Sequence, residues 1–274
     1  MYLTPSITAT DSGYLSNKNT GLGNVMFQIA SCYGLAKQTN RIVVWNNLVK
    51  FADKLKNTFG FDHKNTIFRK SLTTENVPFV KISEKDISSY DPLLIEFLKE
   101  NRTPIELFGY LECVSYFHQY RDEITDIFSP DDASIELIRE TYPILFDQTY
   151  TTVSIHFRGN EYLRSDSHIG MAWDYEFYKR AVAFFKEKFN NVIFLIFSDD
   201  MESIDFSFLG GSPYKKMGHK YDYIDLWCLT LCKHNVVSRS TFSFWGAYLN
   251  KNQDAIVLYN KNFIKPYHSM FQSI

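Results

Sequence analysis

Hydrophobic and polar positions follow the clearest pattern in the second half of the chain. Thr152–Phe157 alternates and is rich in β-branched residues, and Val192–Phe197 is an almost continuous apolar run of strand length. Between them, residues 174–189 repeat apolar positions at helical spacing, with Asp174 placed to cap the helix. The same reasoning predicts helices over 223–233 and 241–249, and strands over 235–238 and 255–258. Alternating strands and helices predict a parallel sheet with helices on both faces.

The first half carries a less regular pattern. Thr20–Asn24 contains two glycines and precedes an amphipathic stretch, Val25–Gln38, so it predicts a loop that opens a helix. It is neither a Walker motif nor a full dinucleotide fingerprint. Residues 46–90 are mixed and polar and give no clear element. Strands are predicted over 42–45 and 105–111, and helices over 92–100, 114–128 and 131–142.

The pattern restarts near Tyr150, where we place a domain boundary. A length of 274 residues is comfortable for two domains of ordinary size. We therefore predict an α/β protein with one Rossmann-like domain over residues 1–150 and a second over 151–274. The tail from about Asn260 is a candidate to pack back on the first domain.

Composition and charge exclude several classes of protein. Net charge is −2, with 29 basic and 31 acidic residues interspersed, whereas a nucleic-acid binder concentrates basic residues on one face. No apolar stretch reaches the length of a bilayer, and Met1–Tyr14 lacks the basic leader and apolar core of a signal peptide. The four cysteines lie in apolar segments without CxxC spacing. We expect reduced thiols and a cytoplasmic protein.

Polar residues stand at three predicted strand ends in the second half, namely His156–Arg158, Ser198–Asp200 and Ser238–Thr241. Ligands of doubly wound sheets bind beyond the carboxyl ends of the strands. All three segments should therefore meet at one edge of the second sheet and form a ligand site.

Each segment has two interpretations. Arg158 could bind a diphosphate through its fixed fork of donors, or form a surface ion pair. Ser240 and Thr241 could hold a phosphate, cap the helix that follows, or do both. Asp199 and Asp200 could bind Mg²⁺ or Mn²⁺, or cap a helix. We favour a site without metal, because arginine and helix N-termini can already carry phosphate charge.

Several segments, in order along the chain, resemble motifs of the α-1,2-fucosyltransferases of glycosyltransferase family 11. Val153–Arg158 is similar to the His-x-Arg-Arg-Gly-Asp-Tyr motif, which the α-1,6-fucosyltransferases share. The resemblance has departures: Gly159 replaces the second arginine, Asn160-Glu161 replaces Gly-Asp, Arg239 replaces an asparagine, and Phe244 replaces a tryptophan. The other matching segments are Gly21–Gln28, Phe108–Leu111 with Tyr116–Phe117, Phe197–Asp200, Cys232–Asn235, Ser240–Ser243 and Trp245–Ala247.

The resemblance implies a GT-B fold, with two Rossmann-like domains facing a central cleft. The acceptor side would belong to residues 1–150 and the GDP-sugar donor side to residues 151–274. The implied reaction is an inverting transfer of L-fucose from GDP-β-L-fucose to a galactose hydroxyl, in α-1,2 linkage, with no metal and no cofactor.

That reaction assigns roles to particular residues. Arg158 and the helix start at Thr241 would stabilise the departing diphosphate, and Arg239 would supply charge lost at Gly159. His156, Glu161 and Asp199 are alternative bases for the acceptor hydroxyl. Asp225 would read the guanine edge, or simply complement the start of a helix. The donor-binding set implied by the resemblance is Asn24, His156, Arg158, Ser198, Asp199, Asp225, Arg239, Ser240 and Thr241.

Two alternatives stay open: a family member that uses another nucleotide sugar, and a sugar-binding module without catalysis. We expect a galactose-containing glycan as the acceptor, in a pathway such as that of the lipopolysaccharide O-antigen. A lipid-linked acceptor would bring the enzyme into peripheral contact with a membrane.

Overall fold

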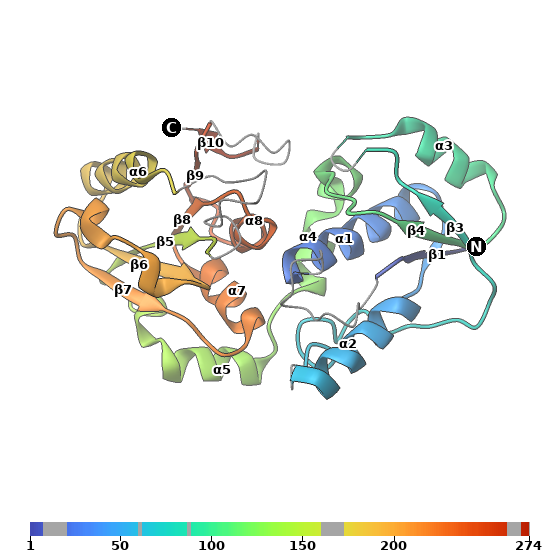
Figure 1. Cartoon of the computed structure of the whole chain (residues 1–274), viewed down its shortest axis with the longest axis horizontal. Coiled ribbons are helices and arrows are strands. Elements are labelled where there is room, and N and C mark those ends of the chain that lie inside the picture. The colour runs from blue at the N-terminus through green and yellow to red at the C-terminus, as the bar shows by residue number, and fades with distance from the viewer. Residues whose placement is uncertain (8–20, 60–61, 87–88, 160–172, 262–269, 274) are drawn as a thin grey trace. The chain divides into compact units, whose positions relative to one another are not determined.

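The computed structural model describes residues 1–7, 21–59, 62–86, 89–159, 173–261 and 270–273. Its contacts divide the chain into two compact units, Met1–Asp131 and Asp132–Ile274 (Figure 1). Each unit contains a parallel sheet with helices, which confirms the predicted α/β class.

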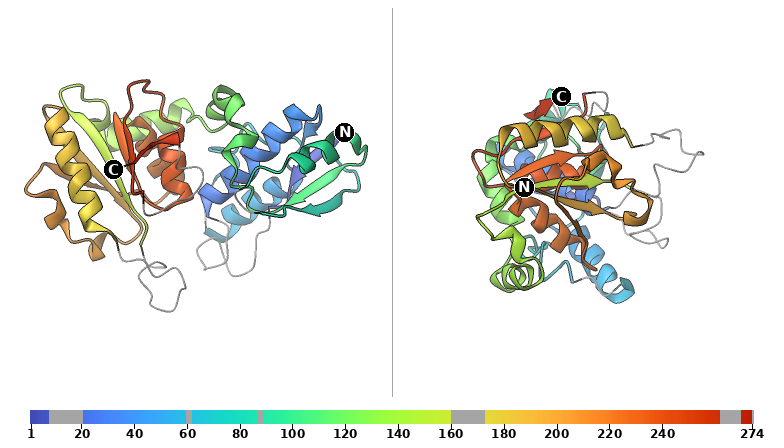
Figure 2. Two further views of the ribbon diagram at one scale, coloured as in Figure 1. Left: turned by 90° about the horizontal axis from the view of Figure 1, so that it is seen from above. Right: turned by 90° about the vertical axis from the view of Figure 1, so that its left-hand side faces the viewer.

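The second unit is built on a six-stranded sheet in the order β10-β9-β8-β5-β6-β7, with every pair parallel. In the right-hand view of Figure 2, α6 lies on one face of this sheet and α7 on the other. The strands are β5 (Thr151–Phe157), β6 (Val192–Ser198), β7 (Tyr214–Met217), β8 (His234–Val237), β9 (Val257–Tyr259) and β10 (Gln272–Ser273); the helices are α5 (Asp132–Thr141), α6 (Tyr175–Lys188), α7 (Asp222–Leu231) and α8 (Thr241–Tyr248).

The core of the second unit explains why its pattern is easy to read. Phe157 from β5 packs against an aromatic group that includes Tyr178 of α6 and Phe208, with ring centroids 4.2 and 5.4 Å away. The carboxylate of Asp174 accepts a bond from the Phe177 N–H at 3.0 Å, so the predicted helix cap is confirmed. Strands buried on both faces need continuous apolar runs, and those runs are visible in the sequence.

The first unit has a smaller sheet in the order β2-β1-β4-β3, also wholly parallel. Arg41, just before β2, joins the ends of several helices and strands of this unit. Its guanidinium donates to the carbonyl oxygens of Leu98, Thr103 and Tyr2 at 2.8, 2.9 and 3.2 Å. The strands are β1 (Tyr2–Pro5), β2 (Ile42–Val43), β3 (Val80–Ser83) and β4 (Ile105–Phe108); the helices are α1 (Leu22–Gln38), α2 (Asn46–Phe59), α3 (Pro92–Glu100) and α4 (Arg121–Ile127).

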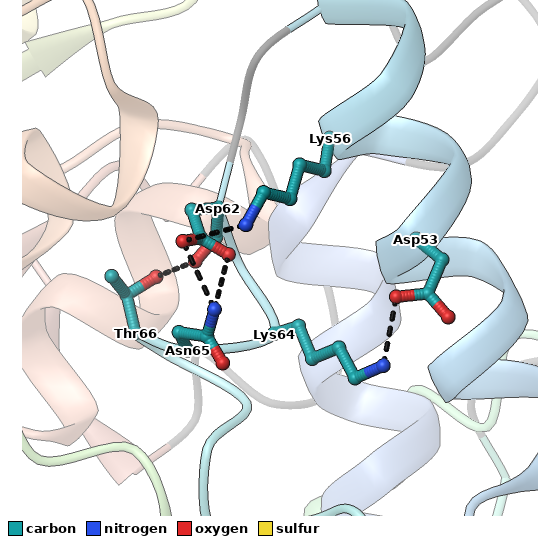
Figure 3. A network of polar contacts seen from close by, with 6 residues as sticks. All are labelled: Asp53, Lys56, Asp62, Lys64, Asn65 and Thr66. Atoms are coloured by element: carbon teal, nitrogen blue, oxygen red, sulfur yellow. Dashed lines mark hydrogen bonds and ion pairs between the residues drawn. The ribbon is translucent and has the colours of Figure 1, made fainter.

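Part of the polar stretch 46–90, which gave no clear prediction, forms α2 and a following turn segment. Two ion pairs join them: Lys64 Nζ lies 2.8 Å from Asp53, and Lys56 Nζ lies 3.3 Å from Asp62 (Figure 3). These side chains are partly exposed, so the pairs stabilise the unit only weakly. The polar composition of residues 46–59 reflects a helix with one buried face, whereas residues 62–79 form turns and irregular chain.

The predicted helix over 114–128 is wrong in its first half. The chain instead forms two 3₁₀ turns, Val114–Tyr116 and His118–Tyr120, before α4 begins at Arg121. Packing explains the difference. Gly34 of α1 lies so close to the Tyr116 carbonyl that an added Cβ would overlap it, and Gln38 donates to the same carbonyl oxygen at 2.6 Å.

The contacts place the division between the units at Asp131, whereas the sequence pattern suggested Tyr150. Helix α5 belongs to the second unit, and the hydroxyl of Tyr142 just after it donates to the Gly218 carbonyl oxygen at 2.6 Å. The tail also differs from expectation, because β10 pairs with β9 and Phe271 contacts Phe244, both in the second unit.

Candidate functional site

The carboxyl ends of β8, β5 and β6 lie side by side in the second sheet. In the strand register, His156 is opposite Phe197 and Phe157 is opposite Ser198, while Ile155 is opposite Val236. The three polar segments that follow these strands therefore leave from one edge, as the sequence predicts. This edge is where doubly wound sheets bind ligands.

Arg158 and Asp199 form an ion pair at this edge. Arg158 Nη1 lies 2.7 Å from Asp199 Oδ2, and the Gly159 N–H donates to Asp199 Oδ1 at 2.6 Å. The side chains of Arg158 and Asp199 are 38% and 44% exposed, so solvent screens the pair and its contribution to stability is about 1 kcal/mol or less. A ligand that offers more negative charge can therefore take the place of Asp199 at the guanidinium.

The backbone of Gly159 lies directly against the next strand end. An added Cβ would overlap that of Asp200 and lie 3.0 Å from Asp199 Oδ1. The residue that replaces the second arginine of the motif is therefore a glycine with little room for any side chain. The Trp173 indole donates to the Arg158 carbonyl oxygen at 2.8 Å and closes the same corner.

His156 is a buried part of the edge, with 6% of its surface exposed. Its Nδ1 shares a hydrogen bond of 2.8 Å with Ser238 Oγ, and the Phe242 ring lies 5.5 Å from the imidazole. Burial lowers the pKa of His156 to about 4, with Asp199 opposing the shift and Arg158 adding to it. The imidazole is therefore neutral at physiological pH, a weak base that connects β5 to the segment after β8.

Ser238–Thr241 turns sharply into α8. The Ser240 N–H donates to the Ser238 carbonyl oxygen at 2.8 Å, and the Ser238 N–H donates to Ser243 Oγ at 3.1 Å. Ser240 occupies the N-cap position without a side-chain capping bond. The first N–H groups of α8 thus point from this edge, an arrangement that suits an anion.

Asp225 lies in the first turn of α7, which follows β7 at the same edge of the sheet. Its carboxylate accepts the His219 N–H, and burial raises its pKa to about 7, with Asp222 adding to the rise. Oδ1 of Asp225 is buried and has no hydrogen-bond partner in the described part of the chain. A buried acceptor of this kind is suited to a ligand that brings N–H donors.

The structure brings together most of the predicted site residues that belong to the second unit. Asn24 lies near the start of α1 in the first unit, and Glu161 lies outside the described residues. Ser198 ends β6, and its hydroxyl accepts the Asp200 N–H at 3.0 Å. Arg239 is half-buried after β8.

Sequence reasoning missed β7, and with it the segment between β7 and α7 whose His219 N–H contacts Asp225. It also assigned no role to Tyr142, Trp173 and Phe242, which contact site residues. The chain is rich in aromatic residues, so these three do not stand out in the sequence. Tyr142 contacts Gly218 through its hydroxyl, and burial and the nearby Asp225 raise its pKa. The short polar run after β7, Gly218–Tyr221, was the available signal.

The described residues contain no group of three or more His, Cys, Asp or Glu side chains placed to hold a metal ion. Both oxygens of Asp199 are bonded, to Arg158 and to the Gly159 N–H. No helix in the described part of the chain is long and apolar enough to cross a membrane.

Solved structures share this fold. Arabidopsis thaliana FUT1, solved with GDP, superposes with a TM-score of 0.51 at 11% identity, covering 97% of this chain and 72% of that chain. The fucosyltransferase NodZ from Bradyrhizobium superposes with a TM-score of 0.50 at 13% identity, covering 89% and 90%. These likenesses establish the fold alone, which is GT-B with two Rossmann-like units.

Sequence relatives are enzymes that transfer sugars. The O-antigen biosynthesis glycosyltransferase WbnK of Escherichia coli is 24% identical, over 87% of this chain and 90% of the relative. An α-1,2-colitosyltransferase of Escherichia coli is 26% identical, over 85% and 86%. Galactoside α-(1,2)-fucosyltransferase 2 of Hylobates lar is 26% identical, over 87% and 69%.

The sequence profile of glycosyl transferase family 11 matches residues 8–273. The chain therefore belongs to glycosyl transferase family 11, and it is a glycosyltransferase, as its motifs predict.

Proposed function

We propose that this enzyme transfers L-fucose from GDP-β-L-fucose to a galactose hydroxyl of a glycan, in α-1,2 linkage and with inversion. The observation that carries the proposal is the edge of the second sheet. There, Arg158 and the start of α8 offer positive charge, and Asp225 offers a buried acceptor. A diphosphate and a guanine base need these two kinds of partner.

The diphosphate would replace Asp199 as the partner of Arg158. In the reaction the acceptor oxygen bonds to the anomeric carbon, the bond from that carbon to the phosphate oxygen breaks, and GDP leaves with the electron pair. Arg158 and the N–H groups at Ser240 and Thr241 stabilise the charge that grows on the diphosphate. Arg239, which follows β8, is placed in sequence to add to this charge.

Guanine presents two neighbouring N–H donors, on N1 and on the exocyclic amine, to one carboxylate. Asp225 has the free acceptor oxygen for this contact, and the stacked rings of Tyr221 and Tyr223, 5.4 Å apart, lie on the loop and helix beside it. Uracil lacks that pair of donors. The carboxylate therefore favours a GDP-sugar over a UDP-sugar.

The acceptor proton must pass to a base. Burial holds His156 neutral with a pKa of about 4, so we assign it to positioning the Ser238 segment. Asp199 becomes available as a base if the diphosphate displaces it from Arg158. Glu161 is the other candidate, by the family resemblance.

Transfer without a metal cofactor is part of the proposal, supported by the bonding of Asp199 to Arg158 and Gly159. A donor other than GDP-fucose is the second candidate, since one relative is an α-1,2-colitosyltransferase. The WbnK relative supports an O-antigen-type glycan as acceptor. A cytoplasmic enzyme, in contact with a membrane through any lipid-linked acceptor, is also part of the proposal.

A donor screen tests the proposal directly. GDP-fucose, GDP-mannose, an activated colitose and UDP-sugars are offered with a galactose-terminated disaccharide, with and without a chelator. We expect transfer from GDP-fucose that the chelator leaves intact. Restoration of lost activity by Mn²⁺ would instead make Asp199 and Asp200 a metal site. Transfer only of colitose would select the second candidate, and GDP binding without turnover would select a non-catalytic module.

Asp225→Asn in the same screen should reduce the preference for GDP over UDP about tenfold, the loss expected when one charged hydrogen-bond partner is removed. Because the pKa of Asp225 is raised to about 7, wild-type preference for GDP should increase as the pH rises through that value and the carboxylate forms. Asp222→Asn, in the same helical turn, is the matched control: it should leave the preference unchanged at pH 8, where Asp225 is ionised, and move the pH dependence to lower pH because the charge of Asp222 helps to raise the pKa of Asp225.

A further inference from the structure

The first unit also has a constrained segment at the carboxyl edge of its sheet, in the turn Gly109–Leu111 after β4. Gly109 has φ +149° and Leu111 has φ +54°. The second value is unusual for a residue with a branched side chain, and such strain persists only where surrounding contacts hold it. The turn also belongs to a segment that the sequence motifs single out.

Glu84, just after β3, holds this turn. Its carboxylate accepts the N–H groups of Tyr110 and Leu111, the latter through both oxygens at 3.0 and 3.1 Å. An added Cβ at Gly109 would overlap the Glu84 side chain, so the backbone must come this close.

Two side chains of α1 hold the opposite side of the turn. Gln28 donates to the Gly109 carbonyl oxygen at 2.7 Å, and Ser31 donates to the Leu111 carbonyl oxygen at 2.7 Å. Gln28 is the last residue of the Gly21–Gln28 motif. Contacts from β3, β4 and α1 therefore determine one conformation of the turn.

The surroundings of Glu84 disfavour its charge. Burial raises the pKa of Glu84 to about 7, opposed by the two backbone N–H groups and strengthened by Glu112 and Asp86. The other titratable groups around it are Cys32 of α1, Cys113, and the hydroxyls of Tyr110 and Tyr116, whose pKa values are all raised, chiefly by burial. Within the described residues, the groups that chiefly shift the pKa of Glu84 include no cation.

We propose that Glu84 is a positioning residue for the sugar acceptor, its carboxylate holding the Gly109–Leu111 turn in the conformation that binds the acceptor galactose. This inference rests on the proposed function and on the family resemblance, which implies that the acceptor side belongs to residues 1–150. Protonation removes acceptor capacity from the carboxyl, so the turn is held firmly above pH 7 and more loosely below it.

Glutamine carries no charge to desolvate, so it avoids the cost of burying the carboxylate. It offers one acceptor oxygen, however, and its NH2 group would face the Leu111 N–H that the second carboxylate oxygen of Glu84 accepts, so it would hold the turn less firmly. Residues that cost stability are retained where function needs them. For a group whose pKa is raised in the folded protein, the stability present below pH 4.5 is lost as the pH rises through about 7. Glu84→Gln should therefore not lower Tm at pH 8.

The test compares wild type, Glu84→Gln and Glu106→Gln between pH 6 and 8. Glu106 is a matched control in β4, away from the turn, where it accepts the Ser6 hydroxyl at 2.5 Å. KM for a galactose-terminated disaccharide, kcat, GDP affinity and Tm are measured for each, and disaccharide affinity is measured by calorimetry without donor.

We expect the wild-type KM for the disaccharide to fall as the pH rises through about 7. Glu84→Gln should raise this KM about tenfold at pH 8 and remove its pH dependence, with GDP affinity and Tm retained. An unchanged KM and pH profile in Glu84→Gln would overturn the proposal. A rise in KM that is accompanied by a similar loss of GDP affinity and a lower Tm would also overturn it.

Failure of the proposed function gives a different result. Suppose that wild type transfers no fucose but binds the disaccharide, and that Glu84→Gln binds the disaccharide more weakly than wild type. This result would refute the donor assignment and keep the role of Glu84. Wild-type protein that binds no galactoside would refute both.

Discussion

The two units present opposite charges at the carboxyl edges of their sheets. In the second unit, a half-exposed guanidinium is paired with a carboxylate that a stronger anion can replace. In the first unit, a half-buried carboxylate is held by two backbone N–H groups on a strained turn. The same type of sheet therefore supports two different sites, and the difference lies in the residues that follow the strands.

The difference matches the two halves of a glycosyl transfer. The leaving diphosphate needs positive charge that is already in place, whereas the acceptor sugar needs hydrogen-bond partners in a fixed geometry. An exposed ion pair can exchange partners at little cost, and a turn held from three elements cannot. The second edge is thus suited to an exchange of anions, and the first to fixed recognition.

Arg158→Ala should have the largest effect on this comparison, because it removes the charge that defines the second edge. We expect turnover to fall a hundredfold or more, corresponding to about 3 kcal/mol. Arg158→Lys should rescue poorly, since it keeps the charge but loses the planar fork. Steady-state turnover and GDP affinity are the measurements.

Two further arginine variants complete that experiment. Arg180→Ala removes an exposed arginine of α6 and should leave both measurements unchanged. If Arg239→Ala loses turnover while Arg158→Ala retains it, the diphosphate contact belongs to Arg239 and our assignment is wrong.

His156 should make the stability of the second unit depend on pH. Its pKa is lowered from 6.5 to about 4, so its contribution is present above pH 6.5 and is lost as the pH falls towards 4. The loss is on the order of 3 kcal/mol at the acid end. The free energy of unfolding, measured with denaturant across this pH window, should fall with pH in wild type. His156→Gln should remove the part of this fall that His156 causes.

His234 is the matched control for this experiment. It is buried, its pKa is also lowered to about 4 by burial, and it accepts the Ile256 N–H at 3.1 Å. Unlike His156, which lies near the carboxyl end of β5, His234 lies at the start of β8 and so at the opposite edge of the sheet. His234→Gln should change the stability slope similarly and leave GDP affinity intact. A matching loss of GDP affinity in both variants would contradict the positioning role of His156.

Gly159→Arg should have the smallest effect of the three, and its direction is informative. Restoring the arginine of the family motif adds a Cβ that overlaps Asp200. We therefore expect a loss of about 1–3 kcal/mol of stability and weaker GDP binding, not a gain. Gly218→Ala, which has open space around its Cβ, is the control for Tm. Tighter GDP binding by Gly159→Arg would show that the strand ends adjust.

The second unit follows closely from the sequence because its strands are buried on both faces. Val192–Phe197 had to be apolar throughout, and the observed β6 differs from the prediction by one residue. The first unit follows less closely because long-range polar contacts act there in addition to a buried core. Arg41 binds carbonyl groups of residues distant in sequence, and such contacts leave no periodic pattern.

The amino-acid sequence is sufficient to predict the α/β class, the order of most elements, the adjacency of His156, Arg158 and Asp199, and the family motifs. Each of these depends on local patterning or on the general rule that parallel strands end at one edge. Three features became visible only in the folded chain: Arg158 pairs with Asp199, Gly159 has little room for a side chain, and Glu84 holds the turn at Gly109. These are contacts between segments far apart in the chain, and no residue type or spacing specifies a distant partner, because burial and close packing select it only after the sheets have formed.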